Sequence, residues 1–125
     1  MRELEFRGKV HGANWNRWKM GSLMQSEAHF FIVKYIYQFG YSTYKFKVIP
    51  ETVGQYIGLK DKNGAKIFEG DIVSDESGGI GEVHWHTEHA CFYWGKGNTF
   101  VHSNELMVIG NIHDNAELLE EANDE

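Results

Sequence analysis

The stretch that most restricts the fold is VGQYIGLKDKNGAKIFEGDIV, residues 53–73, where turn-forming residues interrupt short apolar runs. Its DKNG segment, Asp61–Gly64, has the composition of a tight turn, because aspartate accepts backbone N–H groups and Asn-Gly tolerates positive φ. Apolar residues on either side, among them Tyr56 and Phe68, would form the two arms of a hairpin. Gly70 with Asp71 predicts a second reversal. The stretch therefore favours short strands joined by tight turns.

A phosphate-binding loop is the other structure that such glycines suggest, and the flanking sequence argues against it. A phosphate loop must lead into a helix N-terminus, whereas the residues up to Val73 read as a strand. The GGIG sequence at Gly78–Gly81 fails for the same reason. We therefore predict that the glycines and their turn partners serve backbone geometry. These predicted structural residues are Gly54, Gly58, Asp61, Asn63, Gly64, Gly70, Asp71, Gly110, Asn111 and Asn115.

The rest of the chain also reads as β-structure. Leu4, Phe6 and Val10 alternate with charged residues, which is the period of a half-buried strand. Short apolar runs bounded by glycine or asparagine continue to Ile109, and such close spacing is typical of a small barrel or sandwich. One short helix is predicted to begin at Asn115 as N-cap, followed by an acidic tail at 120–125. The predicted fold class is mainly β.

The segment His29–Phe39 is apolar on both faces of a strand. A barrel wall has one inside and one outside, so one of its two rows would face solvent unless something covers it. The candidate interface is the row Phe30, Ile32 and Ile36, and it predicts a homo-oligomer. The alternative that stays open is that residues 51–125 cover this row within the chain.

Length and composition set the remaining bounds. A chain of 125 residues fits one domain, 1–125. The single cysteine, Cys91, excludes an internal disulfide and suits a reducing compartment. The N-terminal sequence lacks the apolar segment of a signal peptide, and the longest apolar run, Phe30–Val33, is too short to span a bilayer. We expect a soluble, cytoplasmic protein that does not bind membranes.

Charge is divided unevenly along the chain. Residues 1–50 carry eight Lys/Arg and three Asp/Glu, net +5, whereas residues 51–125 carry four and fifteen, net −11. The basic half holds a tyrosine series with interleaved lysines, a composition that could stack nucleic-acid bases: Tyr35, Tyr37, Tyr41 and Tyr44 with Lys34, Lys45 and Lys47. Because the total is acidic, we favour the interpretation that these rings fill the core. Nucleic acid is thus a weaker partner hypothesis.

The sequence HWHTEHAC, residues 84–91, is the candidate metal cluster. His84 and His86 would share one strand face and can chelate zinc, with His89 or Cys91 as a third ligand. The same pattern is an ordinary solvent-facing row opposite buried Val83 and Trp85. A structural zinc site needs four ligands, so we predict no metal and no cofactor. We also find no combination of nucleophile, base and orienting group that predicts an enzyme.

Five segments carry a resemblance to a known family. They are MRELEFRGKV, WKMGSL, IPETVGQYIGLKDKNGAKIFEGDIV, GEVHW and VIGNIHDNAELL, in this order along nearly the whole chain. In these segments the sequence resembles the YopX family of bacteriophage and prophage proteins. The resemblance implies an SH3-like β-barrel, with its motifs concentrated in residues 50–113, in a phage-derived protein of the bacterial cytoplasm. It implies no catalytic residues. Ala116 departs from the family pattern, which usually has proline there.

The sequence thus leads to three functional hypotheses. The first is a phage accessory protein without enzymatic activity, a self-associating β-barrel that binds a host or phage protein. The second is a nucleic-acid-binding module that uses the basic N-terminal half. The third is a small metal-dependent enzyme.

Overall fold

The computed structural model of the chain describes residues 2–12, 18–37, 40–97, 99–101 and 105–123, with the backbone alone at 36, 37, 41 and 121–123. The chain divides into two compact units, which we call the N-terminal unit (Met1–Gln55) and the C-terminal unit (Tyr56–Glu125). The prediction of a single domain over 1–125 stays a prediction. Each unit is described by itself.

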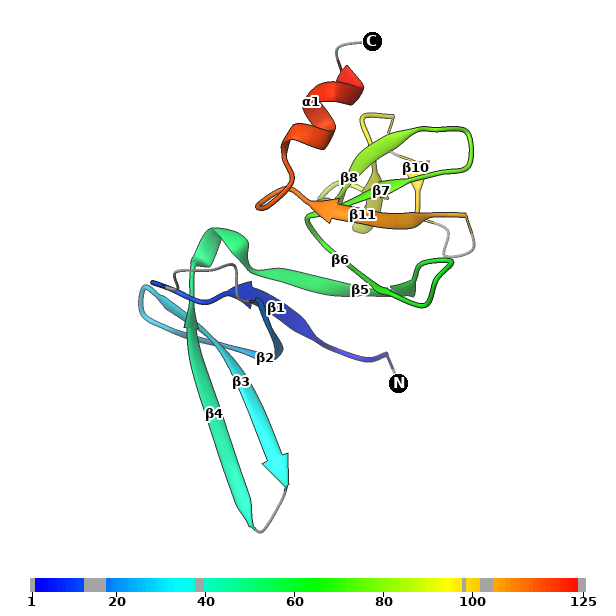
Figure 1. The fold of residues 1–125 in the computed structure, drawn as a ribbon. Coiled ribbons are helices and arrows are strands. Elements are labelled where there is room, and N and C mark those ends of the chain that lie inside the picture. Colours follow the sequence, from blue (N-terminus) through cyan, green and yellow to red (C-terminus); the bar gives the residue numbers. More distant parts are fainter. Residues whose placement is uncertain (1, 13–17, 38–39, 98, 102–104, 124–125) are drawn as a thin grey trace. The chain divides into compact units, whose positions relative to one another are not determined.

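Strands make up most of the described chain (Figure 1). In order they are β1 (Phe6–Lys9), β2 (Trp18–Ser26), β3 (His29–Tyr37), β4 (Tyr41–Val48), β5 (Gly54–Lys60), β6 (Lys66–Phe68), β7 (Asp71–Ser74), β8 (Ile80–His86), β9 (Cys91–Trp94), β10 (Thr99–Phe100) and β11 (Met107–Asn111). A short 3-10 turn, η1 (Pro50–Thr52), precedes β5, and the helix α1 (Glu117–Asn123) follows β11. The prediction of a mainly β protein with a short C-terminal helix is confirmed.

The N-terminal unit is an antiparallel sheet in the order β4-β3-β2-β1. The start of β5 adds to its edge, because Gly54 pairs with Arg7 and Gln55 with Phe6. β3 and β4 form a long hairpin whose register runs from Phe30 opposite Val48 to Tyr37 opposite Tyr41 (Figure 1). This hairpin carries the segment in which the sequence predicted an interface.

This sheet curls, so that the end of β4 reaches β1. Val10 forms an isolated bridge with Val48, and the Ile49 N–H donates to the Lys9 carbonyl at 2.9 Å. A Cβ on Gly8 would lie 2.9 Å from the Val48 side chain, so glycine is required where the strands approach. Ile32 and Val48 are buried on this side of the sheet. We call it the inner face.

The curl corrects the predicted interface. Ile32 is fully buried on the inner face and Phe30, in the same row, is half-buried, so the prediction that this row is an exposed contact surface is wrong. For Ile36, the third residue of the row, the structure describes the backbone alone. Strand parity separates two rows but does not reveal which one a curled sheet encloses. In the opposite row, Tyr35 is 59% exposed.

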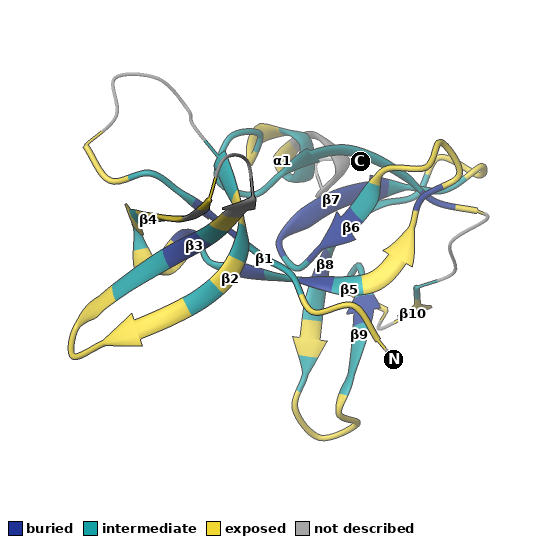
Figure 2. Ribbon diagram, turned by 90° about the horizontal axis from the view of Figure 1, so that it is seen from below, coloured by how far each residue is buried: buried dark blue, intermediate teal, exposed yellow. Residues whose placement is uncertain are grey.

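The C-terminal unit contains an antiparallel sheet in the order β10-β9-β8-β7-β11 and the hairpin of β5 with β6. Its core is a cluster of buried side chains from β6, β7, β8 and the segment before β11: Ile67, Val73, Val83 and Leu106. Figure 2 shows β6 and β7 largely in the colour of buried residues. Neither sheet closes on itself among the described residues, so the SH3-like barrel is not confirmed.

The predicted DKNG turn joins β5 to β6. The carboxylate Oδ1 of Asp61 accepts the backbone N–H groups of Asn63 and Ala65, each at 2.9 Å. Gly64 has a φ of +87°, in the left-handed region that favours glycine. The arms of the hairpin are the predicted ones, with Tyr56 paired with Phe68. The DKNG segment therefore serves backbone geometry, as predicted.

Replacing Gly64 with valine is expected to destabilise the protein by about 1–2 kcal/mol, because a β-branched residue is strained at positive φ. No atom lies within 4 Å of a Cβ built on Gly64, so this cost is conformational and not steric. Urea denaturation followed by tryptophan fluorescence measures it. Ala65→Val, one residue later and also exposed, is the control and should have a small effect. Equal losses in the two variants would mean that φ at Gly64 is not the cause.

The second predicted reversal is also present. Gly70 has a φ of +93°, and Oδ2 of the buried Asp71 accepts the Phe68 N–H at 2.7 Å. A buried aspartate is thus held by the backbone of the turn that it closes, and its position in sequence already indicated this role.

The start of the C-terminal helix differs from the prediction. α1 begins at Glu117, and Oδ1 of Asn115 accepts the Asn111 N–H at 3.2 Å, toward the preceding turn. The Asn115 carbonyl accepts the Leu118 N–H at 3.0 Å, so the helix starts close to the predicted residue, and the difference lies in this side-chain hydrogen bond, which joins the preceding turn and not the helix. Gly110 explains the difference, because a Cβ there would lie 2.6 Å from Oδ1 of Asn115, and glycine leaves room for this side chain to fold back.

Candidate functional site

The first candidate surface is the side of the N-terminal sheet opposite Ile32 and Val48, which we call the outer face. Antiparallel register and the two-residue period of a strand determine which side chains share it. These residues are Lys9 of β1, Met20 and Met24 of β2, Phe31, Val33 and Tyr35 of β3, and Lys45 and Lys47 of β4. The outer face therefore combines aromatic rings, apolar side chains and lysines.

Cations and rings are in contact on this face. The Lys45 Nζ lies 4.7 Å from the centre of the Phe31 ring, and the Arg7 guanidinium lies 4.8 Å from the Trp18 ring. Lys45 and its neighbour on the same face, Lys47, are both exposed. Contacts of this kind hold a lysine over an aromatic surface while its charge remains accessible to an anion.

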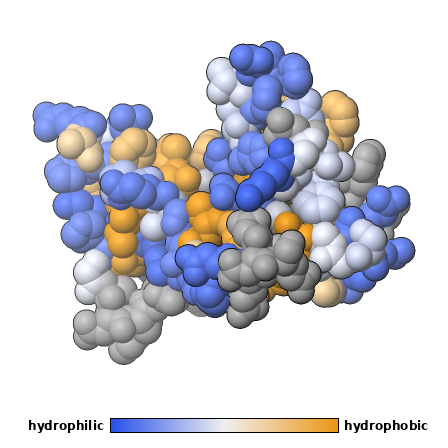
Figure 3. Space-filling model, turned by 90° about the horizontal axis from the view of Figure 1, so that it is seen from above, coloured by the Kyte–Doolittle hydropathy of each residue, from blue (hydrophilic) through white to orange (hydrophobic). Residues whose placement is uncertain are grey.

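A groove of about 470 Å³ crosses the outer face near the start of the chain. Its apolar lining comes from Leu4, Met20, Val33 and Tyr35, and Glu5 contributes a carboxylate at the same end. In the space-filling view, hydrophobic residues reach the surface between hydrophilic ones (Figure 3). The groove is therefore a shallow apolar surface beside the exposed ring of Tyr35.

The tyrosine series of the sequence is divided by the fold. Tyr35 lies on the outer face, whereas Tyr44 pairs with Lys34 in the row of the opposite face. For Tyr37 and Tyr41 the structure describes the backbone alone. The predicted alternation of tyrosine and lysine therefore does not form one surface, and Phe31 and Tyr35 are the described rings of β3 that share a face with Lys45.

The second candidate surface is the end of the β8–β9–β10 sheet, where the register places two aromatic pairs on opposite faces. Trp85 and Phe92 meet edge to face with ring centres 5.0 Å apart, and Tyr93 and Phe100 lie 5.0 Å apart on the other side. Trp85 is 46% exposed and Phe100 58% exposed. We call these four residues the aromatic end. The last part of β8 and the turn after it are drawn largely as exposed in Figure 2.

The exposure of Trp85 corrects the prediction of a buried Val83–Trp85 pair. Val83 is fully buried in the core, but β8 runs on past it, and Trp85 is covered only on one side by Phe92. The alternation of apolar and polar residues predicted the right face for Trp85, because the face of a strand residue follows from parity. It could not show where along the strand the core ends.

The three histidines of the predicted metal cluster have other contacts. His86 and His89 stack with ring centres 4.4 Å apart, and the His89 Nδ1 lies 2.8 Å from the Tyr93 hydroxyl. The His84 Nδ1 lies 3.2 Å from the Glu82 carbonyl oxygen. Within the described part of the chain, no three His, Cys, Asp or Glu side chains come together as a metal-ligand set.

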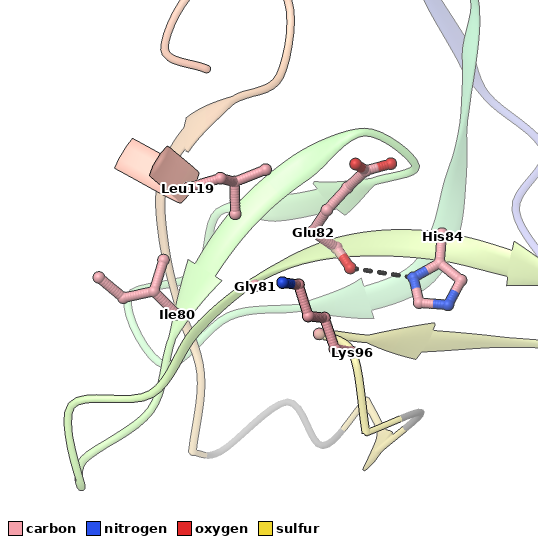
Figure 4. A pocket seen from close by; sticks show the side chains of 7 residues that line it. Ile80, Gly81, Glu82, His84, Lys96 and Leu119 are labelled. Atoms are coloured by element: carbon pink, nitrogen blue, oxygen red, sulfur yellow. Dashed lines mark hydrogen bonds between the residues drawn. The ribbon is translucent and has the colours of Figure 1, made fainter. Parts of the chain in front are cut away.

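A cleft of about 310 Å³ lies between β8, the turn after β9 and α1 (Figure 4). Burial raises the pKa of Glu82 in this cleft; the nearby Glu69 acts in the same direction and His84 in the opposite one. The His84 ring is hydrogen-bonded to the Glu82 carbonyl, as the dashed line in Figure 4 shows. The described lining contains no serine, threonine or cysteine, and it does not assemble a nucleophile with a base.

Asp61 has a role that the sequence did not reveal. Its Oδ2 accepts the Val108 N–H of β11 at 2.9 Å, while Oδ1 serves the local turn. Burial alone would raise the pKa of Asp61, but hydrogen bonds from the backbone N–H groups of Val108, Ala65 and Asn63 outweigh it and hold the pKa below the usual aspartate value. The sequence of a short turn does not indicate a hydrogen bond to a residue 47 positions away.

The closing VIGNI motif is structural as well. Oδ1 of Asn111 accepts the backbone N–H groups of His113 and Asp114, each at 3.0 Å, which shapes the turn after β11. Over the described residues, no helix combines the length and apolarity that crossing a membrane requires.

The fold and its surfaces define a small, mainly β protein of two antiparallel sheets with exposed aromatic rings. The chain belongs to the YopX family, because the family's sequence model, described as YopX protein, matches residues 5–120. This confirms the family that the five segments resembled. No curated protein matches the chain.

One solved structure is similar over nearly the whole chain. It is the crystal structure of protein EF1440 from Enterococcus faecalis, with a TM-score of 0.62 and 21% sequence identity. The similarity covers 95% of this chain and 99% of that chain. At this level of identity the likeness concerns the fold alone.

Proposed function

We propose that the protein is a non-enzymatic binding protein that self-associates through the aromatic end. The observation that carries this proposal is the exposure of Trp85 and Phe100, which lie on the two faces of one sheet at the same end. Tryptophan and tyrosine are the residues that most often dominate protein–protein contacts, because each buries a large area with few rotatable bonds. Trp85 and Phe100 are already held by Phe92 and Tyr93, so little conformational entropy is lost when a partner covers them.

A second copy of the chain is the proposed occupant, and charge supports this choice. The N-terminal unit has eight Lys/Arg and four Asp/Glu, net +4, and the C-terminal unit has four and fourteen, net −10. The acidic unit of one copy would therefore attract the basic unit of another, which steers association at low ionic strength. A host or phage protein with a basic surface is the partner that this reasoning would also accept.

The family membership supports a setting for this function. We propose a phage or prophage origin and action in the bacterial cytoplasm, as the resemblance of the sequence implies. The short strands of the C-terminal unit suit an SH3-like barrel, and that finer description of the fold is part of the same proposal. Fold gives little support to any particular activity, so the proposal rests on the aromatic end.

Trp85→Ala is expected to weaken self-association at least about tenfold, because truncating an aromatic contact residue commonly costs more than 1 kcal/mol of binding free energy. Light scattering with size-exclusion chromatography, over a range of micromolar concentrations, should give a multiple of 14.4 kDa for the wild type. The variant should shift to the monomer mass at the same concentrations. Trp85 lies outside the core cluster, so the variant should fold.

Leu59→Ala is the matched control, because Leu59 is an exposed large apolar residue of the same C-terminal unit but lies outside the aromatic end. It should leave the mass unchanged. A monomeric wild type, or the same shift in both variants, would contradict the proposal that the aromatic end is the contact.

A further inference from the structure

We propose that the outer face of the N-terminal unit binds single-stranded nucleic acid. The proposal does not rest on self-association, because it is argued from other residues than the aromatic end and its test measures nucleic-acid binding directly. Its occupant is defined by chemistry: a chain that carries a negative charge at each repeat and a flat aromatic group beside it. The contacts on the outer face match both parts.

The anionic backbone is matched by lysines in a line. Lys45 and Lys47 are both exposed and project from one face of β4, about 7 Å apart along the strand because side chains repeat every second residue. Lys9 of β1 lies on the same face of the sheet. The N-terminal unit has a net charge of +4, so a phosphate chain meets attraction here although the whole protein is acidic.

The bases are matched by rings on the neighbouring strand. Register places Phe31 opposite Lys47 and Tyr35 opposite Thr43, so the rings of β3 lie beside the lysines of β4. Lys45 already sits 4.7 Å from the centre of the Phe31 ring, which shows that charge and ring are within reach of one nucleotide. A cation held over an aromatic surface is the arrangement that proteins use to track a single strand.

The groove at the other end of β3 offers a seat for one base. Its walls are Leu4, Met20 and Val33, and the Tyr35 ring stands at its side, 59% exposed. A base is flat and apolar on both faces, so it can stack on Tyr35 and cover the apolar lining. Glu5 and Lys34 both line the groove, and because their charges are opposite the groove does not attract a phosphate as the exposed lysines of β4 do. The phosphate track therefore runs along β4 and the bases point toward β3.

Single-stranded nucleic acid fits this face better than a duplex. A duplex keeps its base faces stacked inside, so exposed rings on a protein sheet have nothing to stack on. A protein partner with an acidic surface would also meet the lysines, but it would not need Tyr35. These differences separate the possibilities in one set of measurements.

The test uses fluorescence anisotropy with the full-length protein and a labelled oligothymidine of about 16 nucleotides, the upper end of the site sizes of OB-fold single-strand binders. The single strand should bind at about 50 mM salt and more weakly at about 200 mM. A matching oligouridine shows whether DNA or RNA is the better ligand, and a duplex of equal length should bind at least about tenfold more weakly than the single strand.

The double variant Lys45→Glu with Lys47→Glu should lower affinity at least about tenfold and reduce the dependence of log affinity on log salt by about 1.4, or 0.7 for each lost phosphate contact. Tyr35→Ala should lower affinity several-fold and leave that salt dependence unchanged, because stacking does not release counterions. The matched control is Lys60→Glu with Lys62→Glu, two exposed lysines of the C-terminal unit with the same change of charge. Circular dichroism melting curves confirm that each variant folds.

Three results would overturn the proposal. The first is no binding of either single strand by the wild type at tens of micromolar protein and low salt. The second is an equal loss in the control double variant, which would mean that only net charge matters. The third is a normal affinity in Tyr35→Ala together with equal binding of duplex and single strand, which would reduce the outer face to a general cationic surface.

Discussion

Gly81→Ala is expected to destabilise the C-terminal unit by about 3 kcal/mol or more, the largest effect of any single methyl group that we predict. Gly81 lies in β8 and pairs with Val73 of β7. A Cβ at this position would collide with the Cα of Gly95 and lie 2.7 Å from its nitrogen. Both are backbone atoms, so no side-chain rotation relieves the collision.

Gly95 is also prevented from moving away. Its N–H donates to the Glu82 carbonyl at 3.0 Å, and its φ is +74°. An added methyl group must therefore separate β8 from the end of β9 or break this hydrogen bond. Because a whole domain is stable by only about 5–15 kcal/mol, a loss of this size should lower the urea midpoint strongly.

Gly97→Ala is the control for this prediction. A Cβ on Gly97 would meet only the Thr99 hydroxyl oxygen, at 3.9 Å, so the change should be nearly neutral. Urea titrations of both variants, read by tryptophan fluorescence, decide the matter. Similar midpoints for the two alanine variants would show that the strands have room at Gly81.

Asp61→Asn is expected to cost about 2–4 kcal/mol at neutral pH. The amide oxygen can still accept the N–H groups of Asn63 and Ala65, but the amide nitrogen is a donor and would face the N–H of Val108. The variant therefore loses a charge-assisted hydrogen bond and leaves two donors opposed. Asp75→Asn is the matched control, because the Asp75 Oδ1 serves a local turn through Gly79 and the amide oxygen can replace it.

The same variant has a signature in acid. The folded pKa of Asp61 lies below the usual value, so the carboxylate stabilises the fold fully above the unfolded pKa, about 3.9. That contribution is lost as the pH falls through the folded pKa. The stability difference between wild type and Asp61→Asn should stay constant from about pH 7 to pH 5 and shrink below about pH 4. A difference that persists unchanged in strong acid would mean that the charge of Asp61 is not what the fold uses.

The sequence predicted local structure well where turn chemistry decides it. The turn at Asp61–Gly64, the reversal at Gly70 and the Asn111 turn all follow from residues within four positions of each other. Turns that need local side-chain hydrogen bonds or positive φ are rich in aspartate, asparagine and glycine, so the sequence indicates them directly. The family was recognisable for the same reason, since its most specific segment is the one that forms these turns.

The sequence failed where the answer depends on how a sheet bends. Both rows of β3 are apolar in sequence, and only the bridge from Val10 to Val48 shows that Ile32 is on the enclosed side. Trp85 was assigned to the right face but not to the right depth. The outer face was missed as a unit, because its lysines and rings come from separate strands and meet only through register.

The two oxygens of Asp61 bear on the order in which the chain folds. Oδ1 closes a loop of a few residues, which forms early because little chain entropy opposes it. Oδ2 accepts the Val108 N–H, and this hydrogen bond closes a loop of 47 residues. Contacts between residues so far apart in sequence form slowly. The hairpin can thus present a preoriented acceptor before β11 arrives. We therefore expect the turn held by Asp61 to form before the hydrogen bond from the Val108 N–H.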